Sequence, residues 1–267
     1  MESAEKHSIA SLLSRRNAAL KGDSGDTGRA YKRAEVTHMI RRNYPAFEPI
    51  RDVVLKRHAD DFRSDGFNSH QLQIVEILMD HGLVSEDQDG HSASHGEAKR
   101  YLGGGWLEEM AWLAAMEAGA DEAVFAQTLK WNAKGYHGQN EIDLIVRKGT
   151  RLGFTSCKAV NSKFDSENRK HRNRLMETLH EADNLVDHFG RDGDRVAILV
   201  TADLIDELRN QPRYIALMGK AAVLDVRVIP LEELVWDKLV SALGELIHDE
   251  VNIPELERTE PYERDTD

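Results

Sequence analysis

Three short runs of strand-forming residues follow one another between residues 123 and 158, and they limit the possible folds more than any other feature. The runs are AVFAQTLKW (123–131), EIDLIVRK (141–148) and RLGFTSCK (151–158). A long polar helix is expected from about 167 to 188, and RVAILVT (195–201) is typical of a buried strand. A meander of three strands followed by a helical crossover predicts a mixed sheet with helices on both faces.

The segments around this meander extend the same α/β pattern. Before it, apolar residues recur at helical spacing from residue 103 to 118. After it, we expect a helix over 202–218, a strand over 223–229 and a helix over 231–247. These elements predict an α/β domain over residues 103–250. Residues 251–267 are acidic, contain two prolines and are predicted to be a mobile tail.

Residues 1–98 differ, because they are rich in charge and helix formers and contain no clear strand. Their pattern predicts a mainly helical region, with helices over 2–19, 30–42, 47–62 and 69–81. Ser69 is the expected N-cap of the last helix, and Gly82 is expected to end it. The helix over 71–83 can be interpreted as part of a winged-helix-like module, although generic helical packing is the favoured interpretation. The polar stretch 85–97 is the predicted linker.

Composition narrows the class of protein. The formal net charge is −12, which argues against a protein that coats nucleic acid, but a nuclease needs only a local basic patch. The single cysteine, Cys157, cannot form an intrachain disulfide and fits a reducing compartment. The sequence shows no signal peptide and no apolar run near the ~20 residues of a membrane span. We therefore expect a cytoplasmic protein.

Two carboxylates lie two residues apart in the second strand run. Glu141 and Asp143 should point to one face of the sheet, with Ile142, Leu144 and Val146 on the other. Adjacent carboxylates repel each other, and a divalent cation such as Mg²⁺ or Mn²⁺ removes that repulsion. This spacing favours a metal site over a merely solvated strand face.

The third strand run supplies a cation to the same place. Ser156 and Lys158 should share one face, and Cys157 should point to the other as a small hydrophobic residue. If the second and third strands pair, the Lys158 ammonium lies near the two carboxylates. It can then hold a phosphate oxygen or orient a water molecule.

A third carboxylate can come from the helix over 103–118. With Leu107 at the centre of the apolar stripe, Glu108 lies about 100° round the helix, at the edge of that stripe. Glu109 lies about 200° round and is predicted to face solvent. Glu108 is therefore the expected third ligand.

The three motifs GGWLEE (104–109), NEID (140–143) and SCK (156–158) together resemble the core of PD-(D/E)xK, restriction-endonuclease-like nucleases. They are most similar to the nuclease domain of the CRISPR ancillary nucleases that carry a CARF sensor domain. The resemblance covers residues 103–247. It implies a metal-dependent endonuclease that hydrolyses phosphodiester bonds of DNA or RNA, in antiviral defence. It implies Glu108, Glu141 and Asp143 as ligands of Mg²⁺ or Mn²⁺ and Lys158 as the fourth catalytic residue.

Two departures from the family pattern stand out. Ser156 occupies the position that usually holds Glu or Asp, and serine is a poor Mg²⁺ ligand. Residues 1–100 also lack the strand–helix alternation of a Rossmann-like CARF domain, so activation by a cyclic oligonucleotide is not implied.

Basic residues follow the third motif. The run RKHRNR (169–174) begins about ten residues after Lys158, and we consider Lys163, Arg169, Lys170 and Arg172 as nucleic-acid-binding residues. A homodimer is plausible, because many such nucleases are dimers. Two alternatives stay open: a catalytically degenerate nucleic-acid-binding or regulatory protein of the same fold, and a helical adaptor that binds another protein.

Overall fold

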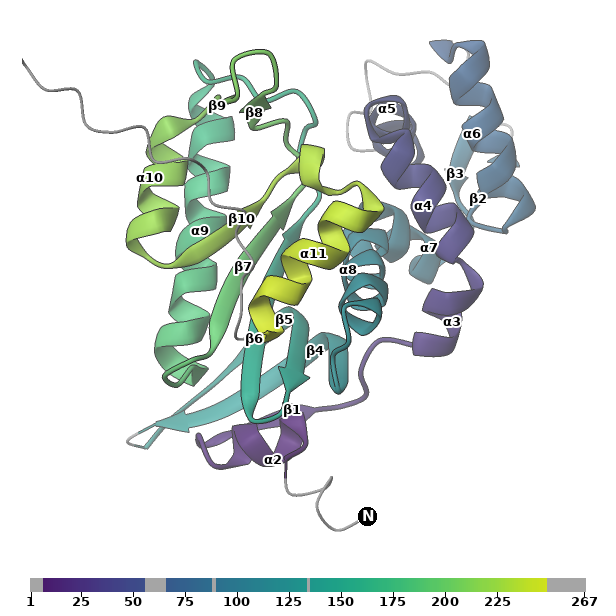
Figure 1. Cartoon of the computed structure of the whole chain (residues 1–267). Coiled ribbons are helices and arrows are strands. Elements are labelled where there is room, and N and C mark those ends of the chain that lie inside the picture. Colours follow the sequence, from purple (N-terminus) through teal and green to yellow (C-terminus); the bar gives the residue numbers. More distant parts are fainter. Residues whose placement is uncertain (1–6, 56–65, 88–89, 134, 249–267) are drawn as a thin grey trace, which may run out of the picture.

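The structure is a computed structural model that describes residues 7–55, 66–87, 90–133 and 135–248 (Figure 1). The predicted acidic tail over 251–267 lies outside the described residues, as do the first six residues. Among the described helices, none is both long and apolar enough to cross a membrane.

A six-stranded mixed sheet forms the centre of the molecule, in the order β1-β4-β5-β6-β7-β10. β4 (Glu122–Ala133), β5 (Tyr136–Lys148) and β6 (Arg151–Lys158) form the antiparallel meander. β6, β7 (Arg195–Val200) and β10 (Val226–Ile229) are parallel. The predicted mixed α/β architecture is confirmed.

Helices cover both faces of this sheet (Figure 1). On one face lie α9 (Arg169–Phe189) and α10 (Ile215–Val223), and on the other lie α8 (Trp106–Glu117) and α11 (Trp236–Ile247). Each face therefore has its own hydrophobic cluster, which we call the α8 cluster and the α9 cluster. The two helical layers leave the end of the meander as the place where polar groups can gather.

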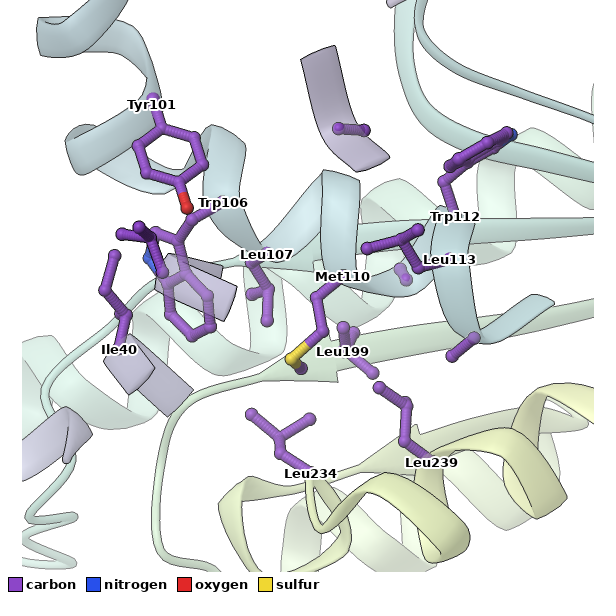
Figure 2. Close-up of a cluster of buried hydrophobic side chains, with 14 of the residues drawn as sticks. Ile40, Tyr101, Trp106, Leu107, Met110, Trp112, Leu113, Leu199, Leu234 and Leu239 are labelled. Atoms are coloured by element: carbon purple, nitrogen blue, oxygen red, sulfur yellow. The ribbon is translucent and has the colours of Figure 1, made fainter. Parts of the chain in front are cut away.

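The α8 cluster is continuous from the N-terminal helices to α11. Figure 2 shows Met110 of α8 directed toward Leu199 of β7, with Leu234 and Leu239 approaching from the α11 segment. All four side chains are buried to 1% exposure or less. Truncating a methionine buried this deeply to alanine costs about 2–5 kcal/mol, so α8 is held firmly against the sheet.

The N-terminal region is mainly helical, as predicted, but the expectation that it contains no strand is wrong. Its helices are α2 (Ile9–Ser14), α3 (Thr27–Lys32), α4 (Ala34–Arg42), α5 (Tyr44–Val54), α6 (Ser69–Asp80) and α7 (Gly96–Arg100). β1 (Ala18–Lys21) pairs with β4 at the sheet edge. The expected helix over 2–19 ends early, because the strand AALK obtains its partner from a segment more than a hundred residues away.

A hairpin replaces much of the predicted linker over 85–97. β2 (Val84–Asp87) and β3 (Gly90–Ala93) pair in antiparallel register, and Gly90 adopts φ +106°. Their polar residues gave no strand pattern, yet the backbone groups bond across the ladder. A helix followed by a hairpin is the order found in a winged helix, and that interpretation stays a prediction. The α6 sequence SHQLQIVEILMD contains no Lys or Arg, which does not favour phosphate binding by this helix.

The ends of α6 follow ordinary capping rules. Asn68, not Ser69, is the N-cap, and with Gln71 it forms a reciprocal capping box. Gly82 follows the helix with φ +66°, as predicted for a glycine that ends it.

The expected helix over 202–218 is wrong in its first half. This segment contains β8 (Ile205–Asp206) and β9 (Gln211–Pro212), and α10 begins only at Ile215. Asp206 Oδ1 accepts hydrogen bonds from the amides of Leu208 and Arg209, so its side chain stabilises a turn in place of a helix.

A local distortion of the sheet sits beside the predicted site. Ala126 of β4 adopts φ +51°, and the β4–β5 register skips the Ala126–Asp143 position. Leu144 and Val146 pack in the α8 cluster, whereas Ile142 packs in the α9 cluster. The prediction that Ile142 shares their face is therefore wrong, because the alternation of side chains breaks at Asp143.

Candidate active site

The strands β5 and β6 separate where the acidic motif begins. Their ladder ends at the Leu144–Thr155 pair. Beyond it, Asp143 Oδ2 accepts a 2.6 Å hydrogen bond from the backbone amide of Cys157 and a 3.3 Å bond from the Ser156 hydroxyl. A carboxylate thus takes the place of the next rung of the ladder. The adjacent strand pairing predicted from the sequence brings these residues together.

The surroundings of Asp143 oppose its ionisation. Burial raises the pKa of Asp143, and the charge of Glu141 raises it further. The Cys157 amide, the charge of Lys158 and the Ser156 hydroxyl lower the pKa of Asp143 in part. The net direction is upward, so burial outweighs the groups that stabilise the anion.

Glu108 approaches the same place from the first turn of α8. Its side chain is 16% exposed, and Oε2 lies 3.3 Å from the Arg100 guanidinium. Burial and then the charge of Asp143 raise the pKa of Glu108 to about 7, with a smaller contribution from Glu141. Two desolvated carboxylates from different elements therefore repel each other here, which is the electrostatic situation that a bound cation relieves.

Glu109 is not the solvent-facing residue that the helical angles predict. It is 4% exposed and forms a two-pronged pair with Arg33, whose Nε donates to Glu109 Oε2 at 2.8 Å. The Arg33 guanidinium also lies 4.0 Å from the centre of the Tyr101 ring. The helices α3 and α4 cover this side of α8, so the exposed angle of the isolated helix becomes an interior contact.

Lys158 ends β6 on the α9 side of the sheet. Its side chain is 29% exposed, and Nζ lies 3.7 Å from Glu181 Oε2 on α9. Cys157 packs instead against the α8 cluster, as the strand alternation predicts. Burial, together with the charges of Asp143 and Glu108, raises the pKa of the Cys157 thiol well above its usual range. The thiol is therefore not an activated nucleophile.

The donor set has the chemistry that Mg²⁺ or Mn²⁺ requires: carboxylate oxygens on Glu108, Asp143 and the exposed Glu141, whose charges act on one another. Within the described part of the chain, however, no three His, Cys, Asp or Glu side chains converge closely enough to hold a metal ion. The pair between Glu108 and Arg100 and the bonds from Ser156 and Cys157 to Asp143 hold these side chains in their present positions.

The predicted nucleic-acid-binding residues lie in the loop after β6 and at the start of α9. Lys163, Arg169 and Lys170 are exposed, whereas Arg172 is half-buried and donates to the Ser166 carbonyl. The sequence pattern does not predict three residues near the site: Arg100 beside Glu108, Glu181 beside Lys158, and Arg174 on α9. The Lys158–Glu181 pair joins β6 to α9, so no local signal reveals it, and the Arg100–Glu108 pair spans eight residues across the break between α7 and α8, which is not a helical i,i+4 spacing. Arg174 belongs to the basic run and was within reach of the pattern.

Comparison with known proteins supports the fold. Neither a model of a known protein family nor a curated protein matches the chain. Two solved structures are similar: protein VC1899 from Vibrio cholerae, with a TM-score of 0.64 and 15% identity, and Can2 from Sulfobacillus thermosulfidooxidans in complex with cyclic tetra-adenylate, with a TM-score of 0.62 and 13% identity.

Each similarity covers 89% of this chain and 61% of the other. This chain therefore spans less than two thirds of the length of either neighbour. The covered share is larger than residues 103–250 alone could supply, so the likeness extends into the N-terminal region. At these identities the comparison shows the fold, which this chain shares with Can2 and VC1899.

Proposed function

We propose that this chain is a metal-dependent nuclease that hydrolyses phosphodiester bonds of nucleic acid. One observation carries the proposal: Glu108 and Asp143, from separate elements, are both buried, and the charge of Asp143 helps to raise the pKa of Glu108, while the charge of Lys158 acts on Asp143. Buried carboxylates that repel each other destabilise the folded state, and such groups are concentrated at catalytic and metal-binding sites. The β5–β6 ladder ends at the Leu144–Thr155 pair, next to Asp143, which supports the proposal.

Glu108, Glu141 and Asp143 would hold Mg²⁺ or Mn²⁺ in this proposal. A bound divalent ion stabilises negative charge on the phosphate and lowers the pKa of a water molecule. Glu108 would leave Arg100 to join the shell, and Asp143 would keep its Cys157 and Ser156 partners, which fix its orientation. Lys158, held near Glu181, would place its ammonium against a phosphate oxygen and offset the charge that develops there.

The sequence motifs and the fold support a role in defence against foreign nucleic acid. GGWLEE, NEID and SCK resemble the PD-(D/E)xK motifs of CRISPR ancillary nucleases, and the fold is that of Can2. We propose DNA or RNA as the substrate and a homodimer as the working assembly on the same resemblance.

Ser156 favours a second candidate, a nucleic-acid-binding or regulatory protein that has lost catalysis. The side chain is 6% exposed and hydrogen-bonds Asp143, where the family pattern places an acid. The loss of one anionic ligand would weaken metal binding.

One experiment separates the two candidates. Purified protein is incubated with supercoiled plasmid, single-stranded DNA and RNA, each with Mg²⁺, Mn²⁺ or EDTA. The nuclease predicts cleavage with metal and none with EDTA. Binding of the same substrates without cleavage under any metal condition would select the second candidate.

A further inference from the structure

A pocket of about 350 Å³ opens directly beyond Lys158. Its wall is formed by the chain that continues from β6, namely Ala159, Val160 and Asn161, and by the first two turns of α9. Arg51 of α5, Phe164 and Ala202 complete the lining. A volume in this range suits one small ligand or one unit of a larger one.

The charges around the pocket are of one sign. Lys170, His171 and Arg174 of α9 line it, and none of its lining residues within the described chain is acidic. Lys170 and Arg174 are four residues apart, so they lie on the same side of α9. Neither side chain has a hydrogen bond or ion pair with any described residue. In a protein whose net charge is −12, two unpaired cations on one pocket wall select for an anion.

The other charged groups nearby are already matched. Arg51 is 3% exposed, and its guanidinium donates to Asp52 and to the Tyr44 hydroxyl, with Glu48 3.7 Å away. Its charge is therefore used within α5. His171 Nδ1 accepts a 3.3 Å bond from the Asp165 amide, which fixes the imidazole ring beside the pocket. Lys170 and Arg174 are the cations that remain for a ligand.

The pocket also has an apolar and aromatic side. Phe164 stacks on Tyr214 with 5.3 Å between ring centres and 19° between planes. Val160 and Leu175 continue the apolar lining. A phosphate alone needs no such surface, whereas a nucleotide has both an anion and a flat base that stacks on aromatic rings.

The pocket wall is held rigid before any ligand binds. The amide of Val160 donates to Thr201 Oγ1 at 2.7 Å, and the Val160 carbonyl accepts from the Tyr44 hydroxyl at 2.8 Å. Glu48 accepts from both the amide and the hydroxyl of Ser162, at 3.0 and 2.7 Å. The N-terminal helix α5 thus fixes the loop after the Lys158 strand, and a fixed wall lowers the entropic cost of binding.

We propose that this pocket binds one unstacked nucleotide of a single-stranded nucleic acid, next to the phosphodiester that reaches Lys158. Lys170 and Arg174 contact its phosphates, and Phe164 contacts its base. The inference rests on the proposed nuclease function for the position of the scissile bond. Recognition by a pocket requires a base outside a duplex, so single strands are the preferred substrate.

The test measures binding in EDTA, so that it does not depend on cleavage. Fluorescence anisotropy of a labelled single-stranded oligonucleotide is followed for wild type and for the double variant K170A/R174A. The matched control is R42A/K238A, which removes the same charge from exposed residues of α4 and α11 that have no proposed role in binding. We expect K170A/R174A to weaken binding about tenfold or more and to reduce the slope of log K against log salt by about 1.4, since each single-strand phosphate contact contributes ~0.7.

Three further binding measurements test whether the ligand is a nucleotide of a single strand. Phe164→Leu should weaken single-strand binding several-fold, and a duplex of the same sequence should bind more weakly than the single strand. Equal losses in the two double variants would overturn the pocket, as would tight binding of AMP with none of the oligonucleotide. If wild type binds as described but never cleaves with metal, the pocket stands and the nuclease proposal fails. If wild type cleaves with metal and K170A/R174A binds the oligonucleotide as tightly as wild type, the nuclease proposal stands and the pocket proposal fails.

Discussion

The backbone amide of Cys157 donates a 2.6 Å hydrogen bond to Oδ2 of Asp143, at the point where β5 and β6 separate. This bond links the backbone of β6 to a side chain of β5, and it fixes the orientation of the Asp143 carboxylate. The same oxygen accepts from Ser156 at 3.3 Å. Neighbouring positions 156 and 157 therefore control the acid that the proposal places at the centre of the site.

Replacing Ser156 with glutamate tests what this position has lost. A carboxylate at a site that is 6% exposed and beside Asp143 adds repulsion, so S156E should melt at a lower temperature than wild type in EDTA. Mg²⁺ should raise the melting temperature of S156E more than that of wild type, because the added oxygen is a hard ligand. Cleavage should be retained or increased.

S156A is the matched control, since it removes only the 3.3 Å bond to Asp143. Thermal melts with and without Mg²⁺, followed by a cleavage assay, compare the three proteins. The interpretation of Ser156 as a missing ligand is wrong if Mg²⁺ stabilises S156E no more than S156A.

The pKa of Glu108 predicts a pH-dependent stability in the absence of metal. Its folded pKa is raised from 4.5 to about 7, so the folded state holds a proton that the unfolded state releases. Stability from this group is present below pH 4.5, falls as pH rises through 7, and stays low above that. The loss is on the order of 3–4 kcal/mol.

Glu108→Gln should remove this dependence, because the amide stays neutral. Urea unfolding in EDTA at pH 5 and pH 8 gives the comparison: E108Q should be more stable than wild type at pH 8 and nearly equal to it at pH 5. A constant difference between the two proteins across that range would contradict the raised pKa.

Glu109 should contribute to the free energy of unfolding, whereas Glu108 should contribute to metal binding and cleavage. Glu109→Gln leaves the Arg33 guanidinium half-buried without its anion, and the free energy of unfolding should fall by roughly 3 kcal/mol. The control E177Q changes an exposed glutamate on α9 and should leave unfolding unchanged. Urea midpoints for E109Q, Arg33→Gln and the double variant form a cycle in which the losses are not additive. Equal midpoints for E109Q and E177Q would disprove a structural role.

Periodicity predicts the meander, α8, α9 and the last helix, because each pattern depends on residues that are close in sequence. Strand pairing also predicts the contact of Asp143 with positions 156 and 157, whereas the grouping of Glu141, Asp143 and Lys158 around one ion stays a prediction. The fate of Glu109 could not be predicted this way, since its partner Arg33 lies 76 residues away. Whether a helix face meets solvent or another helix is decided by the fold as a whole.

The missed strands have a similar cause. The AALK segment of β1 has an ordinary helical composition, and only its pairing with residues 128–131 of β4 makes it a strand. The break in alternation at Asp143 depends on Ala126, whose φ of +51° is rare for alanine and has no sequence signature. The contact of Lys158 with Glu181 depends on both β6 and α9 being in place, and the contact of Arg100 with Glu108 depends on the break between α7 and α8.

The measurement that tests the central claim most directly is the cleavage rate of Asp143→Asn with Mg²⁺, on whichever nucleic acid wild type cuts. Asn keeps the size of the side chain and removes its negative charge, so the cleavage rate should fall roughly 100-fold or more. The circular dichroism spectrum and the melting temperature of D143N should match those of wild type. Lys158→Ala should give the same loss. The matched controls are Asp187→Asn and Lys238→Ala, exposed residues of α9 and α11 that the proposal does not use, and both should cut at the wild-type rate. Unchanged cleavage by folded D143N and K158A would contradict the account.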